Sequence, residues 1–571
     1  MGEKSSASPP ELRTWVPWSE LMLQPRTTIA EFKALLSKHS KPGFLIACAK
    51  LSVGFDYGPY ARTVPSHKSF ALLMPHLFPP ELLKRVNWFA ERKRLIFFQG
   101  QLRYLASEVI RLQPSPPEDL AGPENQELGE FMLRAGELLY KPHVVVQDKL
   151  SAMANLVAEF LPTYELDSPT DPMFAFLRFY IFLTIIIDRL PSHLLLFDAE
   201  KEFQKLFPFP LITYAEFIVA FALHATQERS NKNYDSAIDA ALRKSWFKNV
   251  SISQDLIDQM FDSVSFSLEN LPEPKDTLGY GDFEFIRDRP YFRHNGDLYL
   301  LDYEFALGKL ESAVVWRVLR KLPENKKKPF LSFWGHVFEE YVVWMFETYA
   351  DPTLNTLHPG PLYLGGTDQI CDSIIICADT AVLIEAKLAT CKASVRYSGD
   401  YLQVMEYLED RLVTGAGVCQ LLDAVKTICG SPGTLPGWMK GIKKIIPVII
   451  TKDDVGSSWV VNTYLNRRFK DQLGPKSHKG MIVTPLVSLN ISSLERLIWR
   501  VKNNSFAEVL EERIHTNPDM TWPFDAACKY AQKGAARELH RHFDAFEDLT
   551  KKLIKDFDIR EEDIASGPAQ Q

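Results

Sequence analysis

The chain lacks the cysteine patterns that hold small extracellular domains or zinc sites together. Its 571 residues contain seven cysteines, an odd number, and no two of them have the C-x-x-C spacing of paired thiol ligands. The sequence therefore predicts neither a disulfide framework nor a cysteine zinc site. Free thiols are typical of a reducing compartment, and we expect a cytoplasmic protein.

Long hydrophobic runs are also missing. The most apolar stretch, residues 173–187, is 15 residues long and contains Arg178. A membrane-spanning helix needs about 20 apolar residues, so this stretch is predicted to be a buried helix. No basic segment followed by an apolar run opens the sequence, which argues against a secretory signal. We expect no membrane partner.

Charge of neither sign dominates the whole chain, whose formal net charge is −7 with 46% hydrophobic and 24% charged residues. This composition is that of a soluble globular protein, and the length predicts two to four domains. Residues 387–502 nevertheless hold 17 lysines and arginines against nine acidic residues, which leaves a net −15 for the remainder. Such asymmetry is a hint of a polyanion-binding surface, although uneven solvated faces explain it equally well.

We predict a multidomain α/β protein whose parts differ in secondary structure. Residues 28–39 have helical spacing with Thr28 as the N-cap, whereas residues 41–53 resemble a strand after a turn. Residues 113–124 are rich in proline and form the clearest linker. The expected parts are a mixed α/β region (1–112), a mostly helical region (125–280), a hairpin and helix connector (281–325), an α/β domain with a mixed central sheet flanked by helices (326–502), and a helical C-terminal extension with a disordered tail (503–571).

The expected α/β domain alternates helices and strands. Residues 326–350 predict a long amphipathic helix, and residues 371–387 predict a hairpin of two apolar strands. A helix at 415–428 and a buried-type strand at 443–454 follow, and then a strand and a helix within 480–501. This order is typical of an α/β arrangement.

Two acids and a lysine lie at the ends of the predicted hairpin. If its strands pair across residues 378–380, Asp372 and Glu385 come to neighbouring strand ends, and Glu385 and Lys387 share one face because side chains alternate along a strand. Mg²⁺ or Mn²⁺ prefers carboxylate oxygens and keeps several waters that substrate phosphates can replace. Such a metal activates bound water, and the lysine would orient or deprotonate it.

A simpler interpretation stays open. Glu385 and Lys387 would then form an ion pair at a strand end, with Asp372 as a turn cap. Glu-x-Lys occurs four more times in the chain, so the triplet alone is a weak signal. The nearby Asp368 is an alternative to Asp372 as the ligand, and Asp379 is most simply a turn residue.

This hairpin resembles the core of the PD-(D/E)XK nuclease superfamily, over roughly residues 326–500. In "GHVFEEY", Glu339 stands where the family often has an acid on the preceding helix, with Glu340 as the adjacent alternative. In "GAGVCQLL", Gln420 stands where the family's next helix often presents a glutamine. The resemblance implies that the Ala386 backbone carbonyl helps to hold the metal. The chain departs from the family name in having a cysteine, and no proline, before Asp372.

The same residues have plainer interpretations. Glu339 fits a solvated helix face equally well, and Gln420 fits a cap on a backbone group. The segment 466–479 is predicted to be a basic loop that clamps phosphates, or else an ordinary exposed loop. Its basic residues are Arg467, Arg468, Lys470, Lys476 and Lys479. His540 and His542 lie two apart on a helical pattern, and so on different faces, which predicts no metal site.

The resemblance implies a Mg²⁺- or Mn²⁺-dependent phosphodiesterase, an endonuclease more than an exonuclease, that cuts DNA in preference to RNA and leaves a 5′-phosphate. We expect Asp372, Glu385 and Lys387 to carry the chemistry with Glu339 and Gln420. Many members of this family act in restriction or antiviral defence, so the resemblance implies such a role here. The acidic N-terminal region is expected to regulate the enzyme, to form a homo-oligomer or to bind a regulatory protein. The alternative is an inactive nucleic-acid-binding or assembly module that keeps the nuclease fold.

Overall fold

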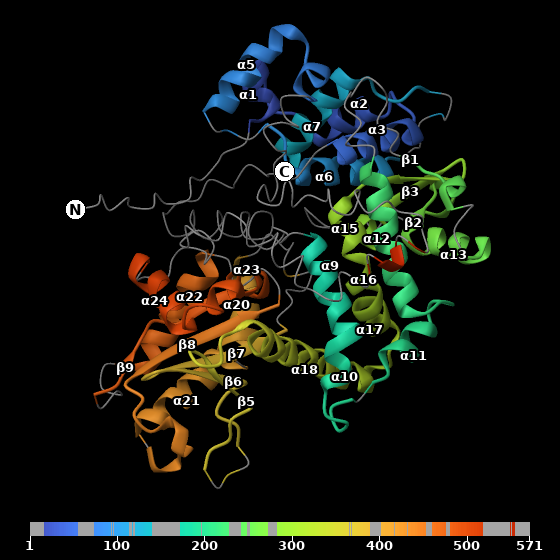
Figure 1. The fold of residues 1–571 in the computed structure, drawn as a ribbon. Coiled ribbons are helices and arrows are strands. Elements are labelled where there is room, and N and C mark those ends of the chain that lie inside the picture. Colours follow the sequence, from blue (N-terminus) through green and yellow to red (C-terminus); the bar gives the residue numbers. More distant parts are fainter. Residues whose placement is uncertain are drawn as a thin grey trace.

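The structure is a computed structural model in which the chain combines many helices with two β-sheets (Figure 1). It is mixed α/β, as the sequence predicts. The described residues are 16–54, 73–92, 94, 96–113, 117, 120–139, 172–195, 197–227, 241–247, 252–271, 283–364, 366, 368–388, 395, 401–415, 417–430, 432–452, 459–474, 480–517, 549, 551–553 and 555.

The first 139 residues contribute only helices to the described part of the chain. They are α1 (Trp18–Met22), α2 (Ile29–Leu36), α3 (Lys41–Gly54), α5 (Pro80–Glu91), α6 (Gln99–Arg111) and α7 (Asn125–Leu139). Thr28 caps α2 as expected, because its side chain accepts a hydrogen bond from the Glu31 backbone N–H.

The prediction of a strand at residues 41–53 is wrong, since these residues form α3. Apolar side chains lie on most sides of this helix, and it packs against α6. A short apolar run that is buried nearly all round has no periodicity that separates strand from helix. The mixed α/β character expected for residues 1–112 is therefore not found in the described residues there.

A second group of helices and a small sheet follow (Figure 1). The helices are α9 (Pro172–Ile181), the π-helical segment η2 (Phe182–Ile186), α10 (Ile187–Arg189), α11 (Ala199–Gln204), α12 (Leu211–Gln227) and α13 (Gln254–Val264). The apolar run that contains Arg178 is thus a largely buried helix, as predicted. Residues 140–171, within the region predicted to be mostly helical, lie outside the described residues.

The small sheet has the order β1-β4-β3-β2. Its strands are β1 (Ala241–Leu242), β2 (Ser265–Phe266), β3 (Tyr291–His294) and β4 (Asp297–Leu300). Asn295 and Gly296 join β3 to β4 with positive φ angles, the geometry that Asn-Gly favours in a tight hairpin. Helices α15 (Tyr303–Leu307), α16 (Lys309–Glu311), the π-helical segment η7 (Ser312–Arg317) and α17 (Val318–Lys321) lead on to the long helix α18 (Glu324–Tyr349).

The larger sheet holds the candidate site. Its order is β10-β8-β7-β6-β5, with β9 also paired to β8. The strands are β5 (Thr356–Pro359), β6 (Ser373–Cys377), β7 (Thr380–Lys387), β8 (Lys444–Thr451), β9 (Ile482–Val483) and β10 (Val487–Asn490). Strand β6 runs antiparallel to both of its neighbours, β5 and β7, while β8 is parallel to β7 and β10 is parallel to β8. The predicted hairpin is confirmed, and the edge strand β5 was not predicted.

Helices cover both faces of this sheet. One face, with Ile374, Leu383 and Ile449, belongs to a hydrophobic cluster with α20 (Tyr401–Leu408), α21 (Val418–Gly430) and α22 (Trp459–Leu473). The other face, with Ile375 and Val382, packs with α18, α23 (Ile491–Val501) and α24 (Phe506–Thr516). This second cluster extends from Val16 to Leu553, so the N-terminal helices and the sheet share one continuous core.

One helical stretch among the described residues, Leu402–Gly430, is long and apolar enough to cross a membrane by length and composition. Of its most apolar window, 59% is buried inside the protein. The core helices of soluble proteins meet the same description, so this stretch gives only weak evidence of a membrane segment.

Candidate active site

The pairing of β6 with β7 places the two predicted acids opposite each other. Ser373 pairs with Ile384 in the antiparallel ladder, and one step further along the ladder brings Asp372 opposite Glu385. Directly opposite residues of an antiparallel pair have side chains on the same face. Because β7 alternates, Lys387 shares that face with Glu385, as the sequence predicts.

The three side chains contact one another. Lys387 Nζ lies 2.5 Å from Glu385 Oε2 and 3.4 Å from Asp372 Oδ2. The Ala386 backbone N–H donates to the same Asp372 oxygen at 2.8 Å. The side chain of Glu385 is 1% exposed, whereas those of Asp372 and Lys387 are 14% and 15% exposed. Glu385 is therefore the deepest of the three, with Asp372 and Lys387 nearer to solvent.

Burial and the neighbouring Asp372 carboxylate raise the pKa of Glu385 to about 8, against the lowering influence of Lys387. Burial favours the neutral form of Lys387, but Asp372 and Glu385 outweigh it and hold the pKa of the amine above its ordinary value. Lys387 is thus an ammonium ion at neutral pH. The site therefore combines one fixed positive charge with two neighbouring carboxyl groups, of which the buried Glu385 keeps its proton to a higher pH than usual.

The helix α18 adds two polar side chains to this site. Glu339 contributes to the raised pKa of Lys387, and its Oε2 atom lies 3.1 Å from His336 Nδ1. Glu340, the adjacent alternative, instead pairs with Arg189 at 2.7 Å. Glu339 is therefore the acid of this pair that faces the predicted site. Asp372, and not Asp368, contacts Lys387.

Sequence reasoning missed His336. The hydrogen bond to Glu339 is the first cause of its raised pKa, partial burial opposes it, and the Asp372 carboxylate also raises it. The signal in the sequence was the i, i+3 spacing of a histidine and a glutamate, which places both on one face of a helix. Which face would lie near the strand ends depended on how α18 packs against β7.

The remaining predicted site residues lie elsewhere or serve other contacts. Gln420 is in the first turn of α21, where its Oε1 atom accepts a hydrogen bond from the Gly417 backbone N–H at 2.9 Å. This is the contact of a helix cap. Among the described residues, Gln420 has no recorded contact with Asp372, Glu385 or Lys387.

The predicted basic loop is wrong for its first half. Residues 466–473 belong to α22, because apolar side chains at Val461, Leu465 and Phe469 recur at helical spacing and are buried. Arg468 is bound to Glu409. Arg467 is 81% exposed and lies 3.7 Å from Asp471, while Lys470 is also exposed. Lys476 and Lys479 lie outside the described residues, as do His540 and His542.

The resemblance implies Mg²⁺ or Mn²⁺ at this site, and the oxygen atoms there fit such a cation. Glu385 Oε2 is buried, and despite its ion-pair contact with Lys387 it has no hydrogen bond of good geometry in the described residues. The Ala386 N–H points toward Asp372, and the carbonyl of a strand residue points to the same side of the strand as its N–H. No group of three or more His, Cys, Asp or Glu side chains that could hold a metal occurs in the part of the chain that the structure describes. Two carboxylates and one carbonyl fit a cation that keeps most of its waters, and they do not fit zinc.

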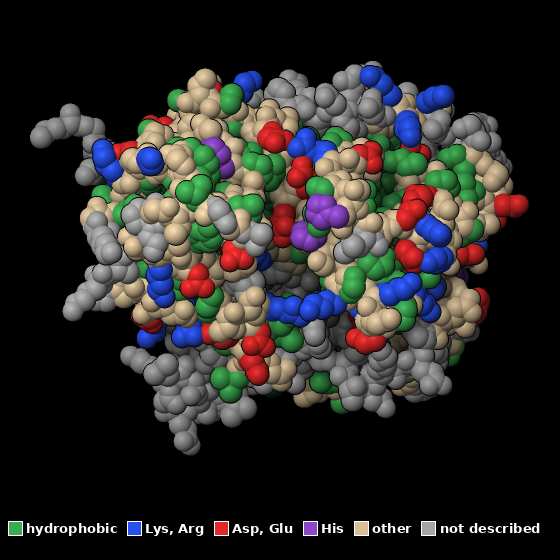
Figure 2. All heavy atoms as spheres, turned by 90° about the horizontal axis from the view of Figure 1, so that it is seen from below, with side chains coloured by type: hydrophobic (Ala, Val, Ile, Leu, Met, Phe, Trp, Pro, Cys, Tyr) green, Lys and Arg blue, Asp and Glu red, His purple; other side chains and the backbone are tan. Residues whose placement is uncertain are grey.

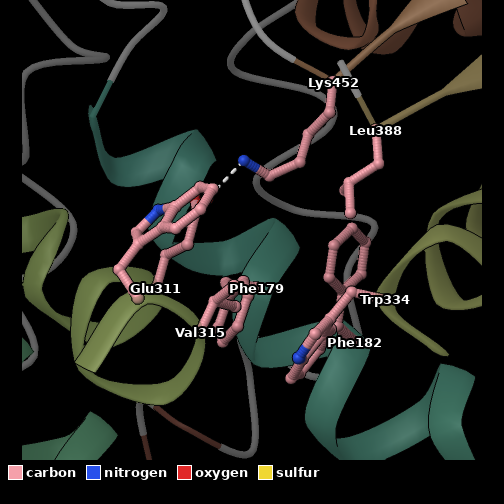
Figure 3. A pocket seen from close by; sticks show the side chains of 8 residues that line it. Phe179, Phe182, Glu311, Val315, Trp334, Leu388 and Lys452 are labelled. Carbon is pink, nitrogen blue, oxygen red and sulfur yellow. Dashed lines mark hydrogen bonds and ion pairs between the residues drawn. The ribbon is translucent and has the colours of Figure 1, made fainter. Parts of the chain in front are cut away.

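A small pocket lies next to the ends of β7 and β8 (Figure 3). Its lining residues are Phe179, Phe182, Glu311, Val315, Trp316, Trp334, Leu388 and Lys452. Figure 3 shows Lys452 reaching from the end of β8 to Glu311, with which it forms an ion pair. The pocket belongs to the cluster that joins the sheet to α9 and η2, on the opposite face of the sheet from Glu385. We interpret it as a packing junction.

One face of the molecule is seen from below in Figure 2, and acidic and histidine side chains lie together beside a hollow near its centre. Lysine and arginine side chains are interspersed with acidic ones across this face, without a broad basic patch among the side chains described there.

Comparison with known proteins returned no relative: no family model matches the chain, and neither a curated protein nor a solved structure matches it.

Proposed function

We propose that the protein is a metal-dependent nuclease of PD-(D/E)XK type that hydrolyses phosphodiester bonds, with DNA as the preferred substrate. One observation carries the proposal. Asp372 and Glu385 lie opposite each other on paired strands, and Lys387 Nζ contacts both carboxylates. Two acids beside a lysine at neighbouring strand ends fit the charge and the attacking water of phosphoryl transfer.

The residues of the chain have separable roles in this reaction. Asp372, Glu385 and the Ala386 carbonyl would hold Mg²⁺ or Mn²⁺, which when bound supplies an activated water and neutralises charge on the phosphate. Lys387, an ammonium ion with a raised pKa, orients the attacking water and offsets negative charge on the phosphate oxygens. Because its amine is already protonated at neutral pH, we assign Lys387 no role as the general base.

The other elements of the proposal come from the sequence and from exposed cations. The preference for DNA, the endonuclease mode, the cytoplasmic location and a role in antiviral defence or restriction rest on the resemblance and the composition. The described exposed cations on α22, Arg467 and Lys470, are candidate phosphate contacts. A regulatory N-terminal region is compatible with the continuous core that joins it to the sheet.

A second candidate function is an inactive nucleic-acid-binding or assembly module. The observation that favours it is the ion pair between Lys387 and Glu385, because it partly compensates the buried carboxylate without a metal. The two functions differ in one respect that is simple to measure. An inactive module needs neither a divalent cation nor Lys387 to bind nucleic acid.

The test is cleavage of plasmid, linear and single-stranded DNA and of RNA by the full-length protein, with Mg²⁺, Mn²⁺ or EDTA. Lys387→Ala is compared with Lys443→Ala, which removes an exposed lysine at the start of β8. We expect metal-dependent cutting that is lost in Lys387→Ala and kept in Lys443→Ala. Binding without cutting by all three proteins would favour the inactive module.

A further inference from the structure

The pair His336 and Glu339 lies within electrostatic range of the site, since Asp372 raises the pKa of His336 and Glu339 raises the pKa of Lys387. Both lie one turn apart on α18, which packs against β7. The imidazole and the carboxylate are each about one-third exposed, at 32% and 34%, so both reach solvent. Asp372, Glu385 and Lys387 lie at the ends of β6 and β7. His336 and Glu339 belong to a different element, the helix α18.

The hydrogen bond between the two fixes the imidazole. Glu339 Oε2 lies 3.1 Å from His336 Nδ1. Because a carboxylate oxygen accepts, Nδ1 carries a hydrogen and donates a hydrogen bond to Glu339. Nε2 is then the ring nitrogen left for another partner, and a carboxylate on Nδ1 makes it a better proton carrier. The hydrogen bond to Glu339 raises the pKa of His336 against the effect of partial burial, and the Asp372 carboxylate raises it further.

We propose that His336, held by Glu339, is a catalytic residue of the proposed nuclease that protonates the leaving oxygen through Nε2. The proposal rests on the proposed function. The water oxygen forms a bond to phosphorus and releases one proton to solvent. The bond from phosphorus to the 3′ oxygen breaks, its electron pair stays on that oxygen, and the oxygen takes the Nε2 proton. Solvent then reprotonates His336.

Lys387 is poorly placed for this step. Its ammonium is engaged by Glu385 at 2.5 Å and by Asp372 at 3.4 Å, on the side of the carboxylates. In-line displacement puts the attacking and leaving oxygens on opposite sides of phosphorus, so a donor on a separate element suits the leaving oxygen. Glu339 is then a positioning residue that acts through His336.

The test uses substrates with different leaving groups. Full-length wild type, His336→Asn and Glu339→Gln are compared on DNA and on thymidine 5′-(p-nitrophenyl phosphate), whose aryl oxide departs without a proton. We expect His336→Asn to slow DNA cleavage by roughly 10²–10⁴-fold, the usual contribution of a general acid, and to leave the aryl substrate little affected. Glu339→Gln should lower the rate of the same step. The variant that carries both substitutions should be no slower than His336→Asn alone.

The matched control is His358→Asn, which removes a histidine of β5 that stacks on Trp438. It should slow both substrates equally or not at all. Equal loss on both substrates in His336→Asn, or no loss on DNA, would overturn the role of His336 while leaving the nuclease proposal intact. If wild type cleaves neither substrate with any metal, the nuclease proposal fails, and this inference fails with it. Thermal melts of each variant identify one that has not folded, in which case His336→Gln replaces His336→Asn.

Discussion

Arg178 and Glu495 form a buried ion pair between helices whose residues are 317 positions apart, with Arg178 Nε 2.6 Å from Glu495 Oε1. Arg178 also donates to Ser492 Oγ at 2.8 Å, and the Tyr341 hydroxyl donates to Glu495 at 2.8 Å. The pair therefore joins α9 to α23 and α18, two of the helices that pack on one face of the sheet. Ring contacts of Phe179 with Trp334 and of Phe182 with Tyr341 continue the same junction.

Breaking this pair should destabilise the whole protein. Arg178→Met leaves the Glu495 carboxylate buried without its cation, and the expected loss is about 3–5 kcal/mol in the free energy of unfolding. Arg320→Ala is the control, because Arg320 and Glu284 form a pair that is half exposed. It should cost at most about 1 kcal/mol in urea unfolding monitored by circular dichroism. Equal effects of the two substitutions would contradict the structural role of the buried pair.

The fragment 326–571 should not fold cooperatively by itself. It would keep Glu495 and Tyr341 but lose the Arg178 guanidinium and the aromatic rings of α9 and η2 that cover α18. We expect it to lack a sharp thermal transition, whereas a fragment that begins at residue 172 should show one. A stable, cooperative 326–571 fragment would show that the junction is dispensable.

Metal binding should depend on pH through Glu385. A carboxyl with a pKa of about 8 is mostly protonated at pH 7, so a cation must displace a proton to bind. We expect Mn²⁺ affinity, measured by calorimetry, to rise between pH 7 and pH 9 and to level off above the pKa. Glu385→Gln should bind weakly at every pH. A wild-type affinity that does not change over this range would contradict the assignment.

Lys309 should make stability rise with pH. Burial, with a smaller contribution from Arg317, lowers the pKa of Lys309 to about 7, and Lys309 Nζ donates to the Asp288 carbonyl at 2.6 Å. Between pH 7 and the ordinary lysine pKa the unfolded chain binds a proton that the folded protein does not, so the free energy of unfolding increases with pH. The slope should approach about 1.4 kcal/mol per pH unit, and Lys309→Met should remove it. Lys321→Met, on the more exposed end of α17, is the control that keeps the slope.

Gln420 should behave as a helix cap. Replacing it with alanine removes the acceptor of the Gly417 N–H, with an expected loss of about 0.5–2 kcal/mol in the free energy of unfolding. The rise in melting temperature on adding Mn²⁺ should stay as in wild type. Loss of that rise in Gln420→Ala would instead support the site role that the resemblance implies.

The sequence alone was sufficient where the deciding interactions are local. The hairpin of β6 and β7 follows from two apolar strands separated by Ala378 and Asp379, and alternation then fixes Glu385 and Lys387 on one face. The Thr28 cap and the helix α18 follow in the same way from side chains within one or two turns. The identity of the three central site residues therefore required no knowledge of the remainder of the chain.

Tertiary structure decided what depends on distant partners. Whether residues 41–53 are strand or helix depended on what buries them, because a short, largely apolar run satisfies either period. The place of His336 and Glu339 beside Asp372 depended on the packing of α18 on β7, and the diversion of Glu340 depended on Arg189, which is 151 positions away. Spacing along the chain specifies which residues share a face, but it does not specify which other element that face will meet.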